Sequence, residues 1–149
     1  MKPLALNKRA KYDYNLLETF EAGLVLKGHE VKSIKTGHIS LKGAYVIIKN
    51  NEAYLINSSV PPYQPKNISE DYSPNRTIKL LLHKKEIKSL IGKSKERGLT
   101  LIPIKVYTKK GKIKLEFAVG QGKKKIDKRE AIKKREVKRK IEKILKKQF

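Results

Sequence analysis

Six residues near the N-terminus combine charged hydrogen-bond donors with an aromatic ring. The run is Asn7-Lys8-Arg9-Ala10-Lys11-Tyr12. Lysine and arginine neutralise phosphate groups, and a tyrosine ring can stack on a base or a sugar. The run therefore suits contact with a nucleic acid, although the pattern fits a solvated N-terminal arm equally well.

Two further side chains, Glu21 and Lys114, occupy positions where alternation predicts that they face away from a core. A carboxylate can accept a hydrogen bond from a base amino group or orient a neighbouring lysine or arginine, but an ion pair within the protein is the simpler interpretation. For Lys114, an ordinary exposed lysine is the simpler interpretation of the pattern. Charge alone supplies affinity without sequence choice, because phosphate contacts position a protein and base contacts specify the sequence.

The residue types that metal sites and enzymes require are sparse. The three histidines, His29, His38 and His83, show no i, i+4 pair, and the chain has no cysteine, so we expect no metal site and no disulfide. The run Gly120-Gln121-Gly122-Lys123 lacks the frame of a phosphate-binding loop and is interpreted as a hinge. Nothing in the sequence argues for catalysis, and we expect no cofactor.

The net charge narrows the choice of partner. The 149 residues include 37 Lys and Arg against 14 Asp and Glu, a net charge of +23. Such an excess favours a polyanion, with a nucleic acid as the first candidate and an anionic membrane surface as the second. No apolar run approaches the ~18 residues of a membrane span, and the N-terminus lacks a secretory segment, so we expect a soluble cytoplasmic protein without a membrane partner.

The charge is distributed unevenly. Residues 123–149 carry 14 Lys and Arg against 4 acidic residues, whereas residues 1–122 carry 23 against 10. A segment as basic as 123–149 buries too little apolar surface to fold alone. The composition therefore predicts a compact basic domain at residues 1–122 and a basic tail at 123–149 that is disordered when free.

The elements that must position the candidate residues are mostly strands. Period-two alternation predicts a strand over residues 12–26, with a bulge at Gly23. Residues 44–56 and 99–119 each predict a hairpin, the first around two asparagines and the second around Gly111. Five or six short strands are typical of a small barrel of the oligonucleotide-binding (OB) type.

Few helices are expected. Residues 28–37, which lie between glycines, predict a short helix or turn, and residues 84–97 predict the main helix, which Gly98 stops. Residues 1–10 lack periodicity and are expected to form a loosely ordered arm. Residues 60–75 contain four prolines and predict a long irregular loop.

The tail has the pattern of a helix. Asp127 with Glu130 forms a helix-start pattern, and apolar residues follow at helical spacing, at Val137, Ile141, Ile144 and Leu145. Because an isolated cationic helix repels itself, we expect the tail to become helical when phosphates neutralise it.

Several runs together resemble the SsrA-binding protein (SmpB) family. They are Asn7-Lys8-Arg9-Ala10, Tyr14, EAGLVLKGHEVKS at residues 21–33, Pro62-Tyr63, KLLLHKKEI at residues 79–87, Gly122-Lys123-Lys124 and Asp127-Lys128-Arg129. The runs occur in the family's order over essentially the whole chain, which is more specific than any single basic patch. The resemblance implies a closed antiparallel β-barrel related to the OB fold, with a few helices and a basic C-terminal tail.

The resemblance also implies a function. It implies a bacterial trans-translation factor, monomeric and without catalytic activity, that binds the tRNA-like part of tmRNA and enters stalled ribosomes with the elongation factor EF-Tu. It implies that the RNA contacts are Asn7, Lys8, Arg9, Glu21, Leu81, His83 and Lys114. It also implies that the tail, with Lys123, Lys124, Asp127, Lys128 and Arg129, lies in the decoding centre and the empty mRNA channel.

The sequence departs from the family pattern at three positions and leaves alternatives open. Ile126 stands where the family often has histidine or an aromatic residue, Ser73 stands before Pro74 where aspartate is more frequent, and Ile78 stands where arginine is frequent. The alternative is another basic translation component, such as a ribosomal protein or an initiation factor. An enzyme such as a nuclease is a third class, and incubation of the pure protein with RNA separates it from the other two.

Overall fold

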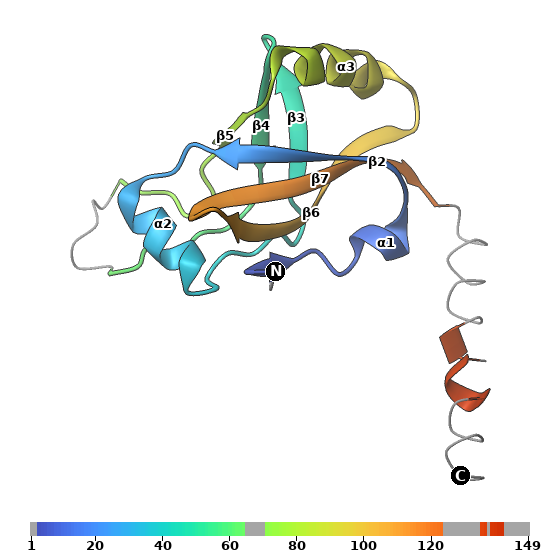
Figure 1. Cartoon of the computed structure of the whole chain (residues 1–149), viewed down its shortest axis with the longest axis horizontal. Coiled ribbons are helices and arrows are strands. Elements are labelled where there is room, and N and C mark those ends of the chain that lie inside the picture. Colours follow the sequence, from blue (N-terminus) through green and yellow to red (C-terminus); the bar gives the residue numbers. More distant parts are fainter. Residues whose placement is uncertain (1–2, 65–70, 124–134, 137, 142–149) are drawn as a thin grey trace.

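Among the residues that the structure describes, seven antiparallel strands form the body of the molecule (Figure 1). The structure is a computed structural model that describes residues 3–64, 71–123, 135–136 and 138–141. The strands are β1 (Ala5–Leu6), β2 (Tyr14–Leu24), β3 (Tyr45–Lys49), β4 (Glu52–Ile56), β5 (Ile78–Leu81), β6 (Leu99–Lys109) and β7 (Lys112–Gly122). The order β6-β3-β4-β5-β2-β7 closes on itself because β7 also pairs with β6, and β1 pairs with β6 outside this ring. The predicted mainly-β barrel is confirmed.

Both predicted hairpins form. Asn50 and Asn51 between β3 and β4 have φ values of 52° and 60°, and Lys110 and Gly111 between β6 and β7 have 51° and 78°. Two successive residues with positive φ match the right-handed twist of paired strands, which explains the asparagine and glycine at these turns. The hairpin at Lys110 and Gly111 thereby sets the register between the outward-facing side chains of β6 and β7.

The inside of the barrel is filled by alternate residues of the long strands. The rings of Phe20 on β2 and Phe117 on β7 stack with their centroids 5.5 Å apart, and Leu115 and Val106 are fully buried beside them. Because side chains alternate along a strand, Glu21 and Lys114 point to the opposite face, as predicted. The core therefore fixes which residues of β2 and β7 face solvent.

The predicted bulge at Gly23 is wrong, because the irregularity of β2 lies at Leu17. The register against β7 shifts between Leu16 and Glu18, and the unpaired Leu17 is 59% exposed. One extra residue reverses the alternation, so Tyr14 faces the opposite side of the sheet from Phe20. Gly23 itself is paired regularly on both sides.

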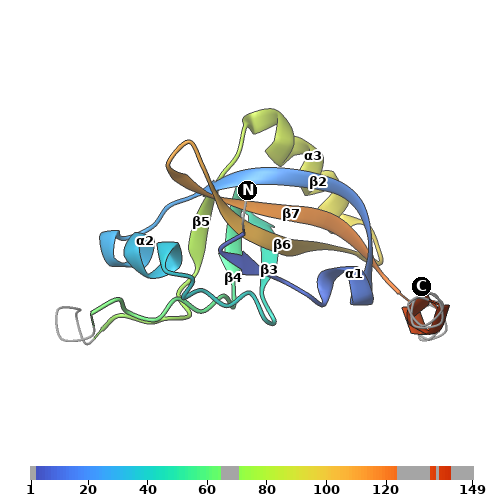
Figure 2. The same cartoon turned by 60° about the horizontal axis from the view of Figure 1, so that its bottom comes forward.

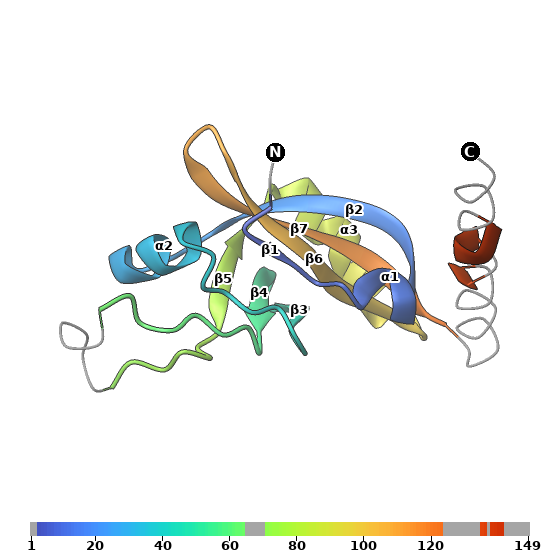
Figure 3. The ribbon, with the colours of Figure 1, turned by 90° about the horizontal axis from the view of Figure 1, so that it is seen from below.

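The N-terminal residues are more ordered than the sequence predicts. Ala5 pairs with Val106 and Leu6 with Lys105, so this part of the predicted loose arm is strand β1 along the edge of β6 (Figure 3). The backbone of Asn7 continues the pairing through its N–H to the carbonyl of Ile104. A four-residue helix, α1 (Ala10–Asp13), follows and delays the start of β2. The free edge of β6 supplies the partner that local periodicity cannot reveal.

Two further helices lie outside the ring. Helix α2 (Gly28–Lys35) and the chain that follows β4 lie at the end of the barrel opposite to α1 (Figures 1 and 2). Helix α3 (Lys84–Lys95) packs on β3 and β6 through the fully buried Leu90. It ends two residues before the predicted limit, and Gly98 takes a φ of 84° in the turn that follows.

A buried carboxylate ties α2 to the segment before β5. Glu30 is 0% exposed, and the guanidinium of Arg76 donates two hydrogen bonds to it, of 2.8 and 2.5 Å. The Tyr72 hydroxyl and the backbone N–H of Lys27 donate two more, at 2.9 and 2.7 Å. Burial alone raises the pKa of Glu30, but these four donors hold it below its ordinary value.

Only part of the tail is described. Residues 135–136 and 138–141 are helical. The predicted tail residues Lys124, Asp127, Lys128 and Arg129 lie outside the described residues. No helix within the described ranges is long and apolar enough to cross a membrane.

Candidate nucleic-acid interface

Six residues on four neighbouring strands form one outward-facing surface, which we call the strand patch. They are Glu21 and Gly23 on β2, Leu81 on β5, Tyr107 and Lys109 on β6, and Lys114 on β7. Gly23 pairs with Leu81 on one side and with Lys114 on the other, and Lys114 pairs in turn with Tyr107. The fold thus brings together three of the predicted RNA contacts, Glu21, Leu81 and Lys114, from distant parts of the sequence.

The carboxylate of Glu21 is the electrostatic centre of the strand patch. The Tyr107 hydroxyl donates a hydrogen bond to its Oε2, and the Lys109 ammonium lies 3.4 Å from its Oε1. The bond from Tyr107 is the main cause that lowers the pKa of Glu21, with smaller contributions from Lys109 and Lys114. Glu21 therefore forms the internal ion pair that the sequence favours, and it presents an ionised acceptor among lysines.

Gly23 allows Leu81 to lie close over the sheet. A Cβ at position 23 would stand 3.3 Å from the Cβ of Leu81, and the Leu81 side chain is 56% exposed. A shallow groove of about 350 Å³ runs beside them and is lined by Gly23, Leu81, Lys114 and neighbouring residues. An exposed apolar side chain next to a lysine suits contact with an unstacked base and its phosphate.

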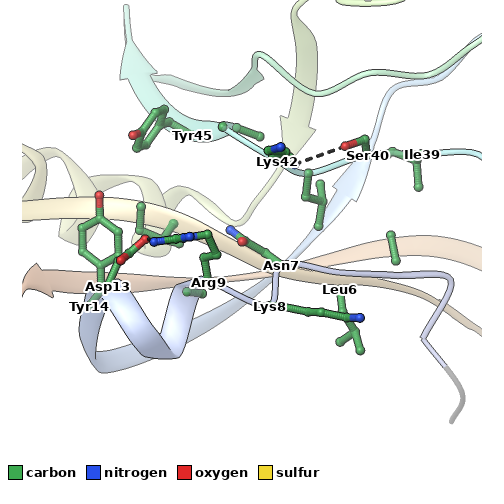
Figure 4. A pocket seen from close by; sticks show the side chains of 16 residues that line it. Leu6, Asn7, Lys8, Arg9, Asp13, Tyr14, Ile39, Ser40, Lys42 and Tyr45 are labelled. Atoms are coloured by element: carbon green, nitrogen blue, oxygen red, sulfur yellow. Dashed lines mark hydrogen bonds and ion pairs between the residues drawn. The ribbon is translucent and has the colours of Figure 1, made fainter. Parts of the chain in front are cut away.

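Asn7, Lys8 and Arg9 line a second and larger depression, the arm groove. It encloses about 810 Å³ between residues 5–10 with 13–14 on one wall and residues 39–45 on the other (Figure 4). Figure 4 shows Asn7 and Arg9 facing Lys42 and Tyr45 across the groove. Cationic side chains with tyrosines on both walls are the types that bind a polynucleotide backbone and its bases.

Two of the arm residues also have structural contacts. The side-chain amide of Asn7 donates to the carbonyl of Pro103 at 2.9 Å. Arg9 pairs with Asp13 at 3.3 Å, and its guanidinium lies 5.3 Å from the centre of the Tyr12 ring. Lys8 is exposed. Arg9 is also exposed in spite of these contacts, so Arg9 and Lys8 are the arm side chains best placed to reach a ligand.

Strand β6 joins the two sites. One edge of β6 pairs with β1, where Leu6 is opposite Lys105, and the other edge pairs with β7, where Tyr107 is opposite Lys114. Lys105 also pairs with Glu116 at 3.3 Å. The arm and the strand patch consequently flank one strand that carries three outward lysines or tyrosines.

Two predicted residues lie apart from these sites. His83 is exposed and occupies the N-cap position of α3, two residues beyond Leu81. Lys123 is the first residue after β7, and its ammonium donates to the carbonyl of Lys11 at 2.9 Å while its N–H donates to that of Asp13. The start of the tail is thus fastened to α1, beside the arm.

Sequence reasoning missed Tyr107 and Lys109 in the strand patch, and Lys42 and Tyr45 in the arm groove. The alternation of β6 places Tyr107 on the outward face, opposite to Val106. An aromatic side chain in a strand is nevertheless more typical of a core. The hairpin register that sets it opposite Lys114 is the signal that identifies it. Among the described residues, no group of three or more His, Cys, Asp or Glu side chains is arranged to hold a metal ion.

Comparison with known families matches this architecture. The family model described as SmpB protein matches residues 4–147. The chain belongs to the SmpB family. An SsrA-binding protein of Persephonella marina is 51% identical over 143 residues, which cover 96% of this chain and 93% of that protein. The SsrA-binding protein of Thermosipho africanus is 52% identical over 147 residues, 98% of both chains.

A solved structure extends the SmpB assignment to three dimensions. It is described as "tmRNA-SmpB: a journey to the center of the bacterial ribosome". Its matching chain is 40% identical, with a TM-score of 0.68 over 88% of this chain and 95% of that one. The fold of the barrel is therefore that of an SmpB protein.

Proposed function

We propose that this protein binds the tRNA-like domain of tmRNA and delivers that RNA to stalled ribosomes for trans-translation. The observation that carries the proposal is the match, over nearly the full length, to SsrA-binding proteins. The net charge of +23 supplies the electrostatic attraction that such a partner requires. No catalytic step and no cofactor is part of this function.

In this proposal the two surface sites divide the work of RNA binding. Lysines of the strand patch and the arm groove neutralise phosphates and set the orientation of the RNA. Glu21, as an ionised acceptor, and Leu81, as an exposed apolar side chain, contact bases or sugars. Asn7 contributes to the arm groove, and His83, which lies apart from both sites at the start of α3, makes a separate RNA contact.

The proposal includes a ribosomal role for the tail. Lys123, Lys124, Asp127, Lys128 and Arg129 enter the decoding centre and the vacant mRNA channel, where the cationic segment 123–149 becomes helical against ribosomal RNA. The protein acts as a monomer in the cytoplasm and travels with EF-Tu. The tail charge of +10 over 27 residues supports a polyanionic environment for it.

A competition gel shift tests the function. The full chain is mixed with labelled tmRNA, and unlabelled bulk tRNA is added in increasing excess. We expect tmRNA to stay bound at tRNA concentrations that would displace a non-specific complex. Equal affinities for the two RNAs would point instead to another basic translation component.

A further inference from the structure

The Glu21 carboxylate is held by side chains that reach it from two strands away. Tyr107 and Lys109 on β6 extend across β7 to Glu21 on β2. Glu21 lies opposite Glu116 in the register, but Glu116 is paired with Lys105. The side chain of Glu21 keeps 36% of its surface exposed, so its remaining acceptor positions are open to a ligand.

Tyr107 is a rigid donor. The residue is only 7% exposed, and the Lys105 ammonium lies 5.5 Å from the centre of its ring. A buried ring with two side-chain torsions delivers its hydroxyl to one place, whereas the exposed Lys109 ammonium approaches the carboxylate at 3.4 and 3.5 Å. The orientation of Glu21 is therefore set by Tyr107 more than by the lysine.

A carboxylate has about four acceptor positions; the Tyr107 hydroxyl occupies one of them, and the Lys109 ammonium donates longer hydrogen bonds of 3.4 and 3.5 Å to the two oxygens. The others repel phosphate and attract N–H or O–H donors, such as base amino and imino groups or a ribose 2′-hydroxyl. The lysines on either side attract phosphates. The strand patch thus has one position that accepts a donor and rejects an anion.

We propose that Tyr107 is a positioning residue that fixes the Glu21 carboxylate as an oriented acceptor for a base or ribose donor of the bound RNA. The inference rests on the proposed function and adds to it. It names the residue through which a basic surface that attracts any phosphate also selects for a hydrogen-bond donor of a base or ribose. Tyr107 acts through Glu21 and does not need to touch the RNA.

The chain contains a matched control on β4 and β5. The Tyr54 hydroxyl donates to Glu52 Oε2 at 2.5 Å, and the Lys79 ammonium lies 3.0 Å from Glu52 Oε1. These three residues are of the same types as Glu21, Tyr107 and Lys109, but they are not part of the strand patch. Tyr54→Phe therefore removes an equivalent hydrogen bond without touching Glu21.

The test measures tmRNA affinity and thermal stability for Tyr107→Phe, Tyr54→Phe, Glu21→Gln and the double variant Tyr107→Phe with Glu21→Gln. We expect Tyr107→Phe to bind about 3- to 10-fold more weakly, as the loss of one oriented hydrogen bond implies. Tyr54→Phe should bind like the wild type. The double variant should bind no more weakly than Glu21→Gln alone, because Tyr107 acts through that carboxylate.

Three outcomes overturn the inference. In the first, Tyr107→Phe binds tmRNA with wild-type affinity. In the second, the losses of tmRNA affinity caused by Tyr107→Phe and Glu21→Gln add up in the double variant. In the third, Tyr54→Phe loses as much tmRNA affinity as Tyr107→Phe. If Tyr107→Phe does not fold, Glu21→Asp replaces it, since the shorter side chain withdraws the carboxylate from the hydroxyl and should reproduce the loss. A wild-type chain that binds tmRNA and tRNA equally overturns the proposed function and the inference with it, whereas selective wild-type binding with an unaffected Tyr107→Phe overturns the inference alone.

Discussion

Leu81 lies over Gly23 at a distance that only glycine permits without adjustment. A Cβ at position 23 would come within 3.3 Å of the Leu81 Cβ and 3.5 Å of its Cδ1. No positive φ is involved, so alanine fits the backbone and only the contact with Leu81 is affected. This glycine serves the surface of the barrel, where the sequence alone suggests a bend.

Gly23→Ala should therefore displace Leu81 and leave the barrel folded. We expect a loss of about 1 kcal/mol in tmRNA binding, or about fivefold, with little change in melting temperature. Gly92→Ala on α3 is the control, because a Cβ there meets nothing within 4 Å. Full affinity for Gly23→Ala in a filter-binding assay would show that Leu81 is not part of the interface.

Lys114 is the other residue whose neighbours define its role. It lies between Gly23 and Tyr107 in the sheet register, close enough to Glu21 to help lower the pKa of that carboxyl. Lys114→Ala should weaken tmRNA binding by about 1–2 kcal/mol if it makes a charged hydrogen bond to the RNA. Lys88→Ala, an exposed substitution on α3, is the control. Equal affinities of the two variants by gel shift would place Lys114 outside the interface.

At the scale of elements, the ion pair of Glu30 and Arg76 holds α2 against the segment that leads into β5. Arg76 also donates to the carbonyls of Val25 and Thr77, both at 3.1 Å. Removing the guanidinium would leave a buried carboxylate without its main partner. Breaking such a pair typically costs about 3–5 kcal/mol.

Arg76→Met should lower the free energy of unfolding at pH 7 by about 3–5 kcal/mol, measured by urea denaturation. The folded pKa of Glu30 is below its unfolded value of about 4.3, so its contribution is complete above that pH and is lost as the pH falls. The gap between wild type and variant should consequently narrow in acid. Lys79→Met, at an exposed pair with Glu52, should cost less than about 1 kcal/mol. A similar cost for both variants would mean that burial of Glu30 does not strengthen its pair.

Local patterns predict the elements that depend on neighbouring residues in the chain. Alternation identifies β2, β6 and β7, asparagines and glycine identify both hairpins, and the apolar spacing identifies α3. Strand β1 escapes because its two residues acquire strand geometry only from the edge of β6. Alternation does not predict the bulge at Leu17. Apolar residues recur at every second position both before and after Leu17, although the bulge turns the earlier residues to the other face of the sheet.

The candidate site can likewise be predicted from the sequence only in part. Glu21 and Lys114 can be identified as outward-facing from alternation, and the family resemblance adds Leu81, His83 and the arm residues. That Glu21, Leu81 and Lys114 adjoin one another follows from strand pairing across the barrel, which alternation does not encode. Tyr107 escapes because its partner, Glu21, is 86 residues away in sequence.

At the scale of the molecule, the chain consists of residues 1–122 and a more densely basic segment that begins at Lys123. Strand β7 ends at Gly122, and Lys123 is fastened to α1 by two hydrogen bonds, each 2.9 Å long. The barrel up to this point contains every residue of the strand patch and the arm groove. Residues beyond it contribute charge to any RNA complex, but none of the described contacts of these two sites.

Truncation at this junction should separate RNA binding from the ribosomal role. A chain that ends at Gly122 should bind tmRNA within about fivefold of the full chain, since both surface sites are kept, and should fail to support tagging of stalled chains. A chain that ends at Lys123 is the matched control, because it keeps the two bonds to α1 while losing the same cationic segment. If the two truncations differ in tmRNA affinity, the anchorage of α1 contributes to the arm groove. If either truncation still supports tagging in a reconstituted translation assay, the tail does not have the proposed role, because the barrel alone would then suffice on the ribosome.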